Sequence, residues 1–160
     1  MIANIPLWVS IQEDAFDIAT LQETLRSDSY HEGAIATFTG YVRTRNVDKT
    51  VNILELEHYP GMTEKSIEAI LQEASERWPL LGASVVHRVG VLKPGDPIVW
   101  VGTSSAHREA AFSACEFVMD YLKTKAPFWK KETGPQGASW VDARESDGDR
   151  ALRWQVDRPT

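Results

Sequence analysis

Four lysines lie within nine residues of this sequence, at Lys123, Lys125, Lys130 and Lys131. No acidic residue separates them, although the whole chain carries a net charge of −6. Like charges that are held close together repel one another unless solvent or an anionic partner compensates them. A lysine that is crowded by cations or partly desolvated has a lowered pKa and can act as an acid, a base or a nucleophile. Lys123 and Lys130 are therefore candidates for handling an anion, with solvated lysines at a helix end as the alternative.

A second candidate lies at the predicted start of a long helix, where residues 104–108 read Ser-Ser-Ala-His-Arg. Ser104 or Ser105 is suited to cap the helix. His107 and Arg108 would then occupy the first turn, where the helix dipole disfavours cations, and such unfavourable choices are more frequent at functional sites. Free backbone N–H groups with an arginine and a histidine would hold a phosphate. A surface turn whose charges point to solvent is the alternative.

A third candidate is the end of a predicted strand, where Tyr41, Val42 and Arg43 precede a polar loop that contains Arg45. A guanidinium group at this position can clamp an anion through two parallel hydrogen bonds. Arginines at strand ends are also common without any ligand, so this segment alone does not indicate a binding site. It supports one only in combination with the other two candidate segments.

Other kinds of site are not indicated. The single cysteine, Cys115, has apolar neighbours on its predicted helix, so we expect a buried structural thiol in a reducing, cytoplasmic compartment. The four histidines lack metal-ligand spacing and no nucleotide-binding or nucleophile-elbow motif is present, so no metal or cofactor is expected. A pI near 5.2 argues against general nucleic-acid binding. No apolar run reaches the roughly 18 residues of a membrane span, and the N-terminus has no signal-peptide pattern.

The elements that position the candidates follow from the spacing of apolar side chains. Strands are predicted at 7–12, 33–43, 51–59, 83–89, 98–103, 128–132 and 139–141, and helices at 14–26, 62–78 and 106–124. The strands 33–43 and 51–59 are expected to form a hairpin. Strand pairs with helices between them predict a single α+β domain with a largely antiparallel sheet and flanking helices. The polar residues 145–160 are expected to form a loosely packed, flexible tail.

A proline links the two candidate lysines. Pro127 ends the last predicted helix and pushes the residue before it toward extended geometry. A reversal of the chain at this point would bring Lys130 back beside Lys123. We therefore expect cations from three separate segments, represented by Lys123, Arg43 and His107, to converge on one pocket.

Several stretches resemble the large, catalytic subunit of molybdopterin synthase. They are residues 36–43, 56–65, 87–90, 105–108, 119–132 and 140–145. The resemblance runs in unbroken order over about residues 30 to 145, and the run that ends at Glu132 is highly specific. It implies a hammerhead-like α+β fold.

The resemblance also implies a sulfurtransferase that converts cyclic pyranopterin monophosphate to molybdopterin. A small ubiquitin-like subunit would deliver the sulfur as a thiocarboxylate at the end of its Gly-Gly tail, and the large subunit would be a homodimer within a heterotetramer. By position, Lys123 and Lys130 would be the catalytic residues. The substrate-binding residues would be Tyr41, Val42, Arg43, His107, Arg108, Lys131, Glu132 and Arg144, the last contributed across the dimer.

Two other functions fit the same residues. A non-enzymatic module that binds a ubiquitin-like tail would use the lysines as docking charges. A phosphate-ester-binding regulator would grip its anion with His107 and Arg108 and make no bond.

Overall fold

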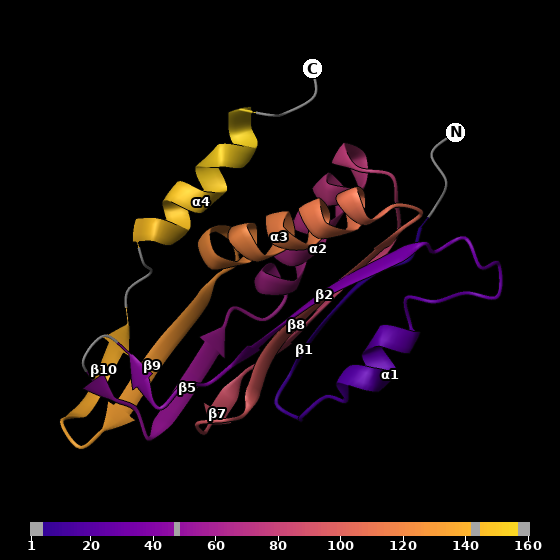
Figure 1. Ribbon diagram of the computed structural model, residues 1–160. Helices are drawn as coiled ribbons and strands as arrows, with labels where there is room; N and C mark the ends of the chain where they lie inside the picture. Colours follow the sequence, from indigo (N-terminus) through magenta and orange to yellow (C-terminus); the bar gives the residue numbers. More distant parts are fainter. Residues whose placement is uncertain (1–4, 47–48, 142–144, 157–160) are drawn as a thin grey trace.

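Residues 5–46, 49–141 and 145–156 are described by a computed structural model (Figure 1). Its helices are α1 (Ile18–Glu23), α2 (Met62–Arg77), α3 (Arg108–Lys125) and α4 (Glu145–Val156). Its strands are β1 (Leu7–Gln12), β2 (Ala34–Tyr41), β3 (Arg45–Asn46), β4 (Lys49–Thr50), β5 (Ile53–His58), β6 (Leu80–Arg88), β7 (Gly90–Leu92), β8 (Pro97–Ser105), β9 (Phe128–Gly134) and β10 (Gly137–Val141). In these ranges no helix is long and apolar enough to cross a membrane.

The strands form two four-stranded sheets and one short hairpin. The first sheet has the order β1-β6-β8-β2 and the second has the order β10-β9-β5-β7, while β3 pairs only with β4. Every pairing is antiparallel except that of β1 with β6. The helices α2 and α3 lie across one face of the first sheet and α1 lies on the other (Figure 1). The predicted α+β fold with a largely antiparallel sheet is confirmed.

Alternation along β6 and β8 explains this layering, because successive strand residues point to opposite faces. Val85 pairs with Val101 and faces the helices α2 and α3, where both join a large buried cluster. Their neighbours Val86 and Trp100 pair on the opposite face and pack toward α1. Each of these buried side chains contributes about 1.5–3 kcal/mol of hydrophobic stabilisation. The first sheet is therefore buried on both faces.

A second buried cluster fills the space between the two sheets. Its members are Val42, Leu54, Leu56, Val89 and Leu92. The ring of Phe128, at the start of β9, packs against this cluster and also against the larger cluster beneath α2 and α3. Phe128 therefore ties the second sheet to the rest of the core.

The strand pairing differs from the predicted hairpin. The strand β2 pairs with β8, and β5 pairs with β9 and β7, so the predicted partnership of 33–43 with 51–59 is wrong. Alternation shows which side chains of a strand are buried, but the free energy that selects its neighbour comes from contacts that are remote in sequence. The short strands β3, β4 and β7 were not predicted, because two or three residues carry no readable period.

The C-terminal segment also differs from the expected loose tail, because residues 145–156 form α4. The indole of Trp154 lies edge-on to Trp78 and Phe117, with ring centroids 5.5 and 5.6 Å apart. Its Nε1 donates to Oδ2 of the buried Asp120 at 2.7 Å, and a guanidinium nitrogen of Arg77 donates to its carbonyl oxygen at 2.6 Å. One aromatic residue thus docks a helix whose average composition is polar.

We expect Trp154→Phe to weaken the docking of α4, because the substitution removes a hydrogen bond to a buried carboxylate. The free energy of opening α4 should fall by about 1–3 kcal/mol, measured by native-state hydrogen exchange of its amides. Leu152→Ala is the matched control, since Leu152 lies on the same helix and is 54% exposed. Its effect should stay within about 0.5 kcal/mol, and equal effects of the two substitutions would disprove the docking role of Trp154.

Candidate active site

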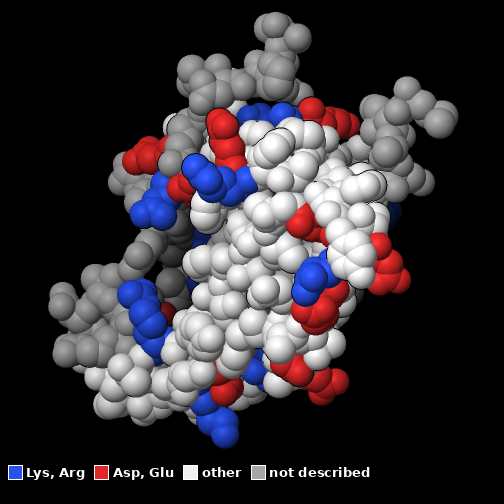
Figure 2. Space-filling model, turned by 45° about the vertical axis from the view of Figure 1, so that its right-hand side comes forward, with Lys and Arg blue, Asp and Glu red and all other residues white. Residues whose placement is uncertain are grey.

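On the face shown in Figure 2, Lys and Arg side chains alternate with Asp and Glu around a largely uncharged centre. This face carries no continuous basic surface, so a site for an anion has to be found from individual residues. Within the described ranges, no group of three or more His, Cys, Asp or Glu side chains is placed to hold a metal ion.

The chain reversal at the end of α3 places the first lysine. Lys123 lies in the last turn of the helix, where the helix dipole favours a cation, and its side chain is exposed. Ala126 follows in extended geometry, with φ −87° and ψ 129°, as expected before Pro127. The hydroxyl of Thr63 donates to the carbonyl oxygen of Pro127 at 3.0 Å and so ties the reversal to α2. β9 begins at the next residue, so Lys130 lies only a short distance along the chain from the end of the helix.

The alternation of β9 separates its two lysines. Lys130 pairs with the buried Leu56 of β5, and Phe128, two residues earlier, shares that inner face. Lys131 lies on the opposite face, where its ammonium is 5.9 Å from the ring centroid of Trp140. The single cationic run in the sequence is therefore divided between two faces of the sheet, and only Lys130 faces the space between the sheets.

His87, one of the four histidines without metal-ligand spacing, lies near both candidate lysines. The imidazole of His87, in β6, stacks on Phe128 with ring centroids 4.0 Å apart and an angle of 18° between the planes. Burial above all, together with the positive charges of Lys123, Lys130 and His58, lowers the pKa of His87 to about 3, although its hydrogen bond with the Arg88 backbone acts in the opposite direction. Both lysines therefore lie close enough to act electrostatically on one neutral imidazole.

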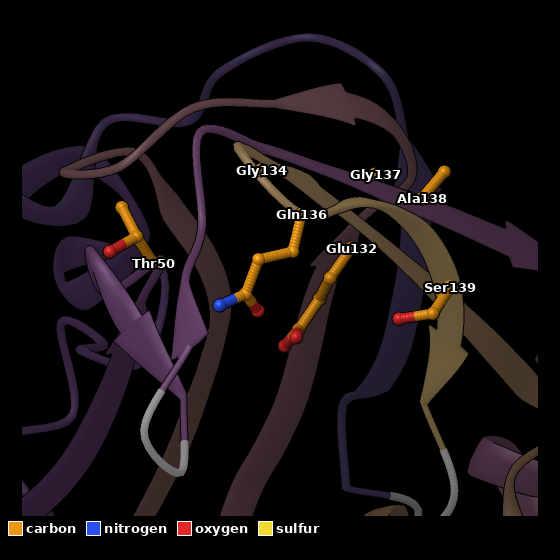
Figure 3. A pocket seen from close by; sticks show the side chains of 7 residues that line it. All are labelled: Thr50, Glu132, Gly134, Gln136, Gly137, Ala138 and Ser139. Atoms are coloured by element: carbon orange, nitrogen blue, oxygen red, sulfur yellow. The ribbon is translucent and has the colours of Figure 1, made fainter.

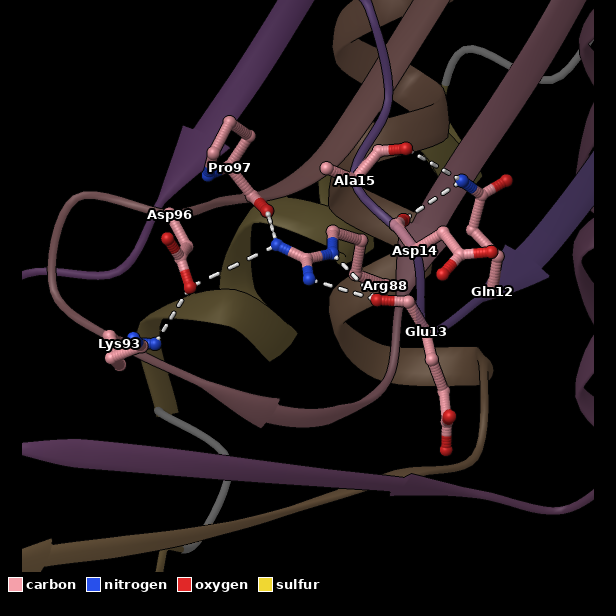
Figure 4. A network of polar contacts seen from close by, with 8 residues as sticks. All are labelled: Gln12, Glu13, Asp14, Ala15, Arg88, Lys93, Asp96 and Pro97. Carbon is pink, nitrogen blue, oxygen red and sulfur yellow. Dashed lines mark hydrogen bonds and ion pairs between the residues drawn. The ribbon is translucent and has the colours of Figure 1, made fainter.

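The residue after His87 fixes this region in place (Figure 4). The Arg88 guanidinium donates to the carbonyl oxygen of Glu13 at 2.9 and 3.1 Å and to that of Pro97 at 3.5 Å. It also forms an ion pair of 3.9 Å with Asp96. The segment after β1 and the turn at residues 96–97 therefore meet at this one side chain, which holds the end of β6 in place.

The segment of the third candidate is attached to the same turn. The N–H of Val42 donates to the carbonyl oxygen of Asp96 at 2.9 Å, and its own carbonyl oxygen accepts from the N–H of Gly95 at 2.8 Å. The Val42 side chain is buried in the cluster that contains Leu56, the partner of Lys130. Tyr41 and Arg43, on either side of it, are exposed. Arg43 thus lies at the edge of the same core as Lys130.

The second candidate lies at the other end of α3. His107 is the N-cap residue, whereas Ser104 and Ser105, the predicted caps, end β8 and are buried. The hydroxyl of Ser105 donates to the carbonyl oxygen of Pro79 at 2.9 Å and accepts weakly from the His107 N–H at 3.4 Å. Lys123 follows His107 by 16 positions, which is about 24 Å at 1.5 Å per helical residue. Within one chain, His107 and Arg108 are therefore not brought to the lysines, contrary to the expected single pocket.

Two cavities lie near the predicted residues. One of about 90 Å³ is lined by Thr50, Glu132, Gly134, Gln136, Gly137, Ala138 and Ser139, in the β9–β10 hairpin beside β4 (Figure 3). The other, of about 240 Å³, is lined by Ser66, Ala69, Ile70, Glu73 and Lys125, between α2 and the end of α3. Of the predicted site residues only Glu132 lines either of these cavities. Arg144 lies outside the described residues.

Cys115 is buried beside the first sheet, as predicted for a structural thiol. Burial, and to a smaller extent the nearby charge of Glu116, raises its pKa to about 12. A thiol with this pKa is almost entirely protonated at neutral pH and is not a nucleophile.

We expect the Cys115 thiol to resist alkylation by iodoacetamide at pH 8 in the folded chain, because the thiolate fraction falls as the pKa rises. At a pKa of about 12 the thiolate fraction is about 10⁻⁴, against about a quarter for a free cysteine. Mass spectrometry should show labelling at least about 100-fold slower in buffer than in 8 M urea. Fast labelling in buffer would contradict the burial, and Cys115→Ser gives the unlabelled control.

Taken together, these residues form a candidate site of an α+β protein, in which Lys123 and Lys130 lie near one neutral imidazole. Comparison with known proteins gives the family. A sequence model described as "MoaE protein" matches residues 11–125. The molybdopterin synthase catalytic subunit of Escherichia coli is 59% identical over 123 residues, which are 77% of this chain and 82% of that protein. The corresponding protein of Vibrio cholerae is 54% identical over 147 residues, covering 92% and 97%.

A solved structure agrees with this assignment. The molybdopterin biosynthesis MoaE protein from Burkholderia ambifaria superimposes with a TM-score of 0.81 at 52% identity, covering 94% of this chain and 99% of that one. The chain belongs to the MoaE family, and the resemblance found in its sequence is confirmed.

Proposed function

We propose that the chain is the catalytic subunit of a molybdopterin synthase. It is a sulfurtransferase that converts cyclic pyranopterin monophosphate to molybdopterin, with sulfur supplied by the C-terminal thiocarboxylate of a small ubiquitin-like subunit. The observation that carries this function is the pair Lys123 and Lys130 around one neutral imidazole, in a chain whose relatives of more than 50% identity are named for this enzyme.

The chemistry fits the residues because both proposed substrates are anions. An ammonium group beside a developing negative charge stabilises the transition state where water is excluded. The thiocarboxylate sulfur attacks the pterin to form a thioester, and water then cleaves the C–S bond, which leaves the sulfur on the pterin and a carboxylate on the partner's tail. Lys123 stabilises the negative charge that develops on the acyl oxygen as water adds, and Lys130 holds the end of the tail. Since the partner brings the sulfur, the chain needs no nucleophilic cysteine. The buried Cys115 agrees with this division, and its single thiol suits the reducing cytoplasm that we propose as the place of action.

A second copy of the chain completes the site in this proposal. His107 and Arg108 lie about 24 Å from Lys123 along one helix, so they can bind the phosphate of the same pterin only from another protomer. A two-fold interface would exchange these contacts reciprocally, which gives the homodimer within a heterotetramer. Arg43 binds the phosphate from the lysine side. The remaining proposed contacts are those of Tyr41, Val42, Lys131, Glu132 and Arg144.

We expect Lys123→Ala to slow dithiolene formation by at least about 100-fold, because an electrostatic group of the transition state is lost. The assay is a single turnover of the complex with thiocarboxylated small subunit and cyclic pyranopterin monophosphate. Lys125→Ala is the matched control. Lys125 lies in the same last helical turn, but its ammonium is 4.3 Å from the centroid of the Tyr121 ring, so turnover should change by less than about threefold.

The outcomes of this assay separate the candidate functions. Full turnover by Lys123→Ala would remove that residue from the mechanism. Tight binding of the small subunit with no dithiolene from the unmodified chain would instead indicate a docking module.

We expect mixed dimers of Lys123→Ala and Arg108→Ala chains to regain activity that neither variant has alone. If each site takes its lysine from one protomer and its arginine from the other, each mixed dimer contains one intact site. Random mixing should therefore restore about a quarter of the wild-type rate. The measurement is turnover after mixing and reassociation, with each variant incubated alone as the control. No gain on mixing would show that the two residues do not share a site across protomers.

A further inference from the structure

We propose that His87 is a positioning residue of this site, whose Nε2 accepts a hydrogen bond from the ammonium of Lys123 when the small subunit closes over it. This inference rests on the proposed function. It assigns a role to a side chain that binds neither sulfur nor phosphate, and it explains why an imidazole is placed between two lysines.

The imidazole is held in place by packing. His87 lies in β6 between Ile11 of β1 and Val99 of β8. Its ring stacks on Phe128 at 4.0 Å, and Phe128 contacts the core clusters on both sides of the site. Lys130 shares the inner face of β9 with Phe128, so the ring lies on the same side of the strand as this lysine. Because β1, β8 and the Phe128 ring of β9 hold the imidazole in place, it can orient a second side chain.

Its protonation state is fixed as well. Nδ1 lies 2.8 Å from the carbonyl oxygen of Arg88, which can only accept, so Nδ1 carries the hydrogen. The other nitrogen, Nε2, is therefore an acceptor in the neutral ring. The anchored guanidinium of Arg88 keeps this carbonyl in position. Among the described residues, the ring's one hydrogen bond is made through Nδ1, and Nε2 has no partner of its own.

The charged surroundings keep the ring neutral. The groups that face it are Lys123 from α3, Lys130 from β9, His58 from β5 and Arg88 from β6, and His58 is itself 3.6 Å from a carboxylate oxygen of Glu64 in α2. Burial holds the pKa of His87 at about 3, and the two lysines act in the same direction. The ring therefore stays an acceptor throughout the pH range in which the enzyme can be assayed.

A neutral acceptor suits this position better than a carboxylate would. An aspartate or glutamate would orient the ammonium but would also neutralise it, and the anionic substrates would lose the attraction. An imidazole orients the ammonium through one hydrogen bond and leaves its charge for the substrate. Because Lys123 is exposed on a flexible four-carbon stem in the free chain, such a contact would reduce its freedom where the reaction needs a defined geometry.

The test compares two substitutions that remove the ring equally but differ at one position. His87→Gln can place an amide oxygen near the site of Nε2 and so keeps an acceptor. His87→Asn can still donate to the Arg88 carbonyl but does not reach that site. We expect the asparagine variant to lower the single-turnover rate by about 10- to 100-fold, as misplacement of a reacting group does. The glutamine variant should stay within about fivefold of wild type, and the KM for the pterin should change little in either.

The second measurement is the mobility of the Lys123 side chain in the complex with the small subunit, followed by NMR relaxation of ¹³C-labelled lysine. A hydrogen bond to the ammonium restricts its flexible four-carbon stem. The asparagine variant should therefore show a more mobile Lys123 side chain than wild type. The glutamine variant should keep the wild-type mobility.

Equal rate losses in both variants with unchanged mobility of the Lys123 side chain would reduce His87 to a packing residue and overturn the inference. The NMR measurement needs no turnover. If the unmodified complex made no dithiolene, the proposed function would fail, while the NMR measurement would still decide whether His87 holds Lys123.

Discussion

The packing of one phenylalanine ring determines where the chemistry of this chain can take place. Phe128 follows the end of α3 after only Ala126 and Pro127 and enters the core at the junction of the two sheets. Because the connection is so short, the last turn of α3 and the first residues of β9 are fixed relative to each other. Lys123 and Lys130 flank this connection, so apolar burial that involves neither lysine sets the position of both. The reversal is further tied to α2 through Thr63.

Electrostatics then explains how an anion fits this arrangement. Two ammonium groups near one imidazole repel each other unless an opposite charge lies close to them. Burial and both lysines keep His87 uncharged, which limits the positive charge that the fold has to tolerate without substrate. An anion that enters between Lys123 and Lys130 attracts both ammonium groups, and this attraction offsets the repulsion between them. In the proposed reaction the phosphate and the thiocarboxylate supply this charge, so binding and catalysis use the same unfavourable arrangement.

Much of the fold follows from the sequence, because the buried faces of its long elements have a clear period. The stripe of α2 through Ile67, Ile70, Leu71 and Ala74 predicts a helix, and all four are buried. The period does not show which strands pair with one another in a sheet. The strands β2 and β5 are predicted separately, but their neighbours β8 and β9 are selected by contacts across the whole chain. The helix α4 was not predicted, because a few side chains, Trp154 and Ala151 among them, pack a segment of polar composition onto the core.

The candidate site shows the same division. Lysine density and Pro127 point to the pair of lysines, since charge and chain reversal are local properties. The separation of Lys130 from Lys131 onto two faces follows from strand alternation once the bounds of β9 are known. His87 could not be selected from its apolar strand, because its role depends on Phe128, 41 positions later in the chain. The distance between His107 and Lys123 was readable from the sequence as helix length, and it already excludes a pocket built from one chain.

That distance has a consequence for how the enzyme is organised. In the proposed function, a helix of fixed length keeps the phosphate-binding end apart from the lysine end, so the proposed site needs residues from two protomers. Assembly would then be a condition for activity, and the small subunit would meet a complete site only on an assembled dimer. A thiol of the chain's own would add a nucleophile that competes with the delivered sulfur. Burial of Cys115, with its pKa raised to about 12, removes that competitor and leaves the thiocarboxylate as the only reactive sulfur in the proposed site.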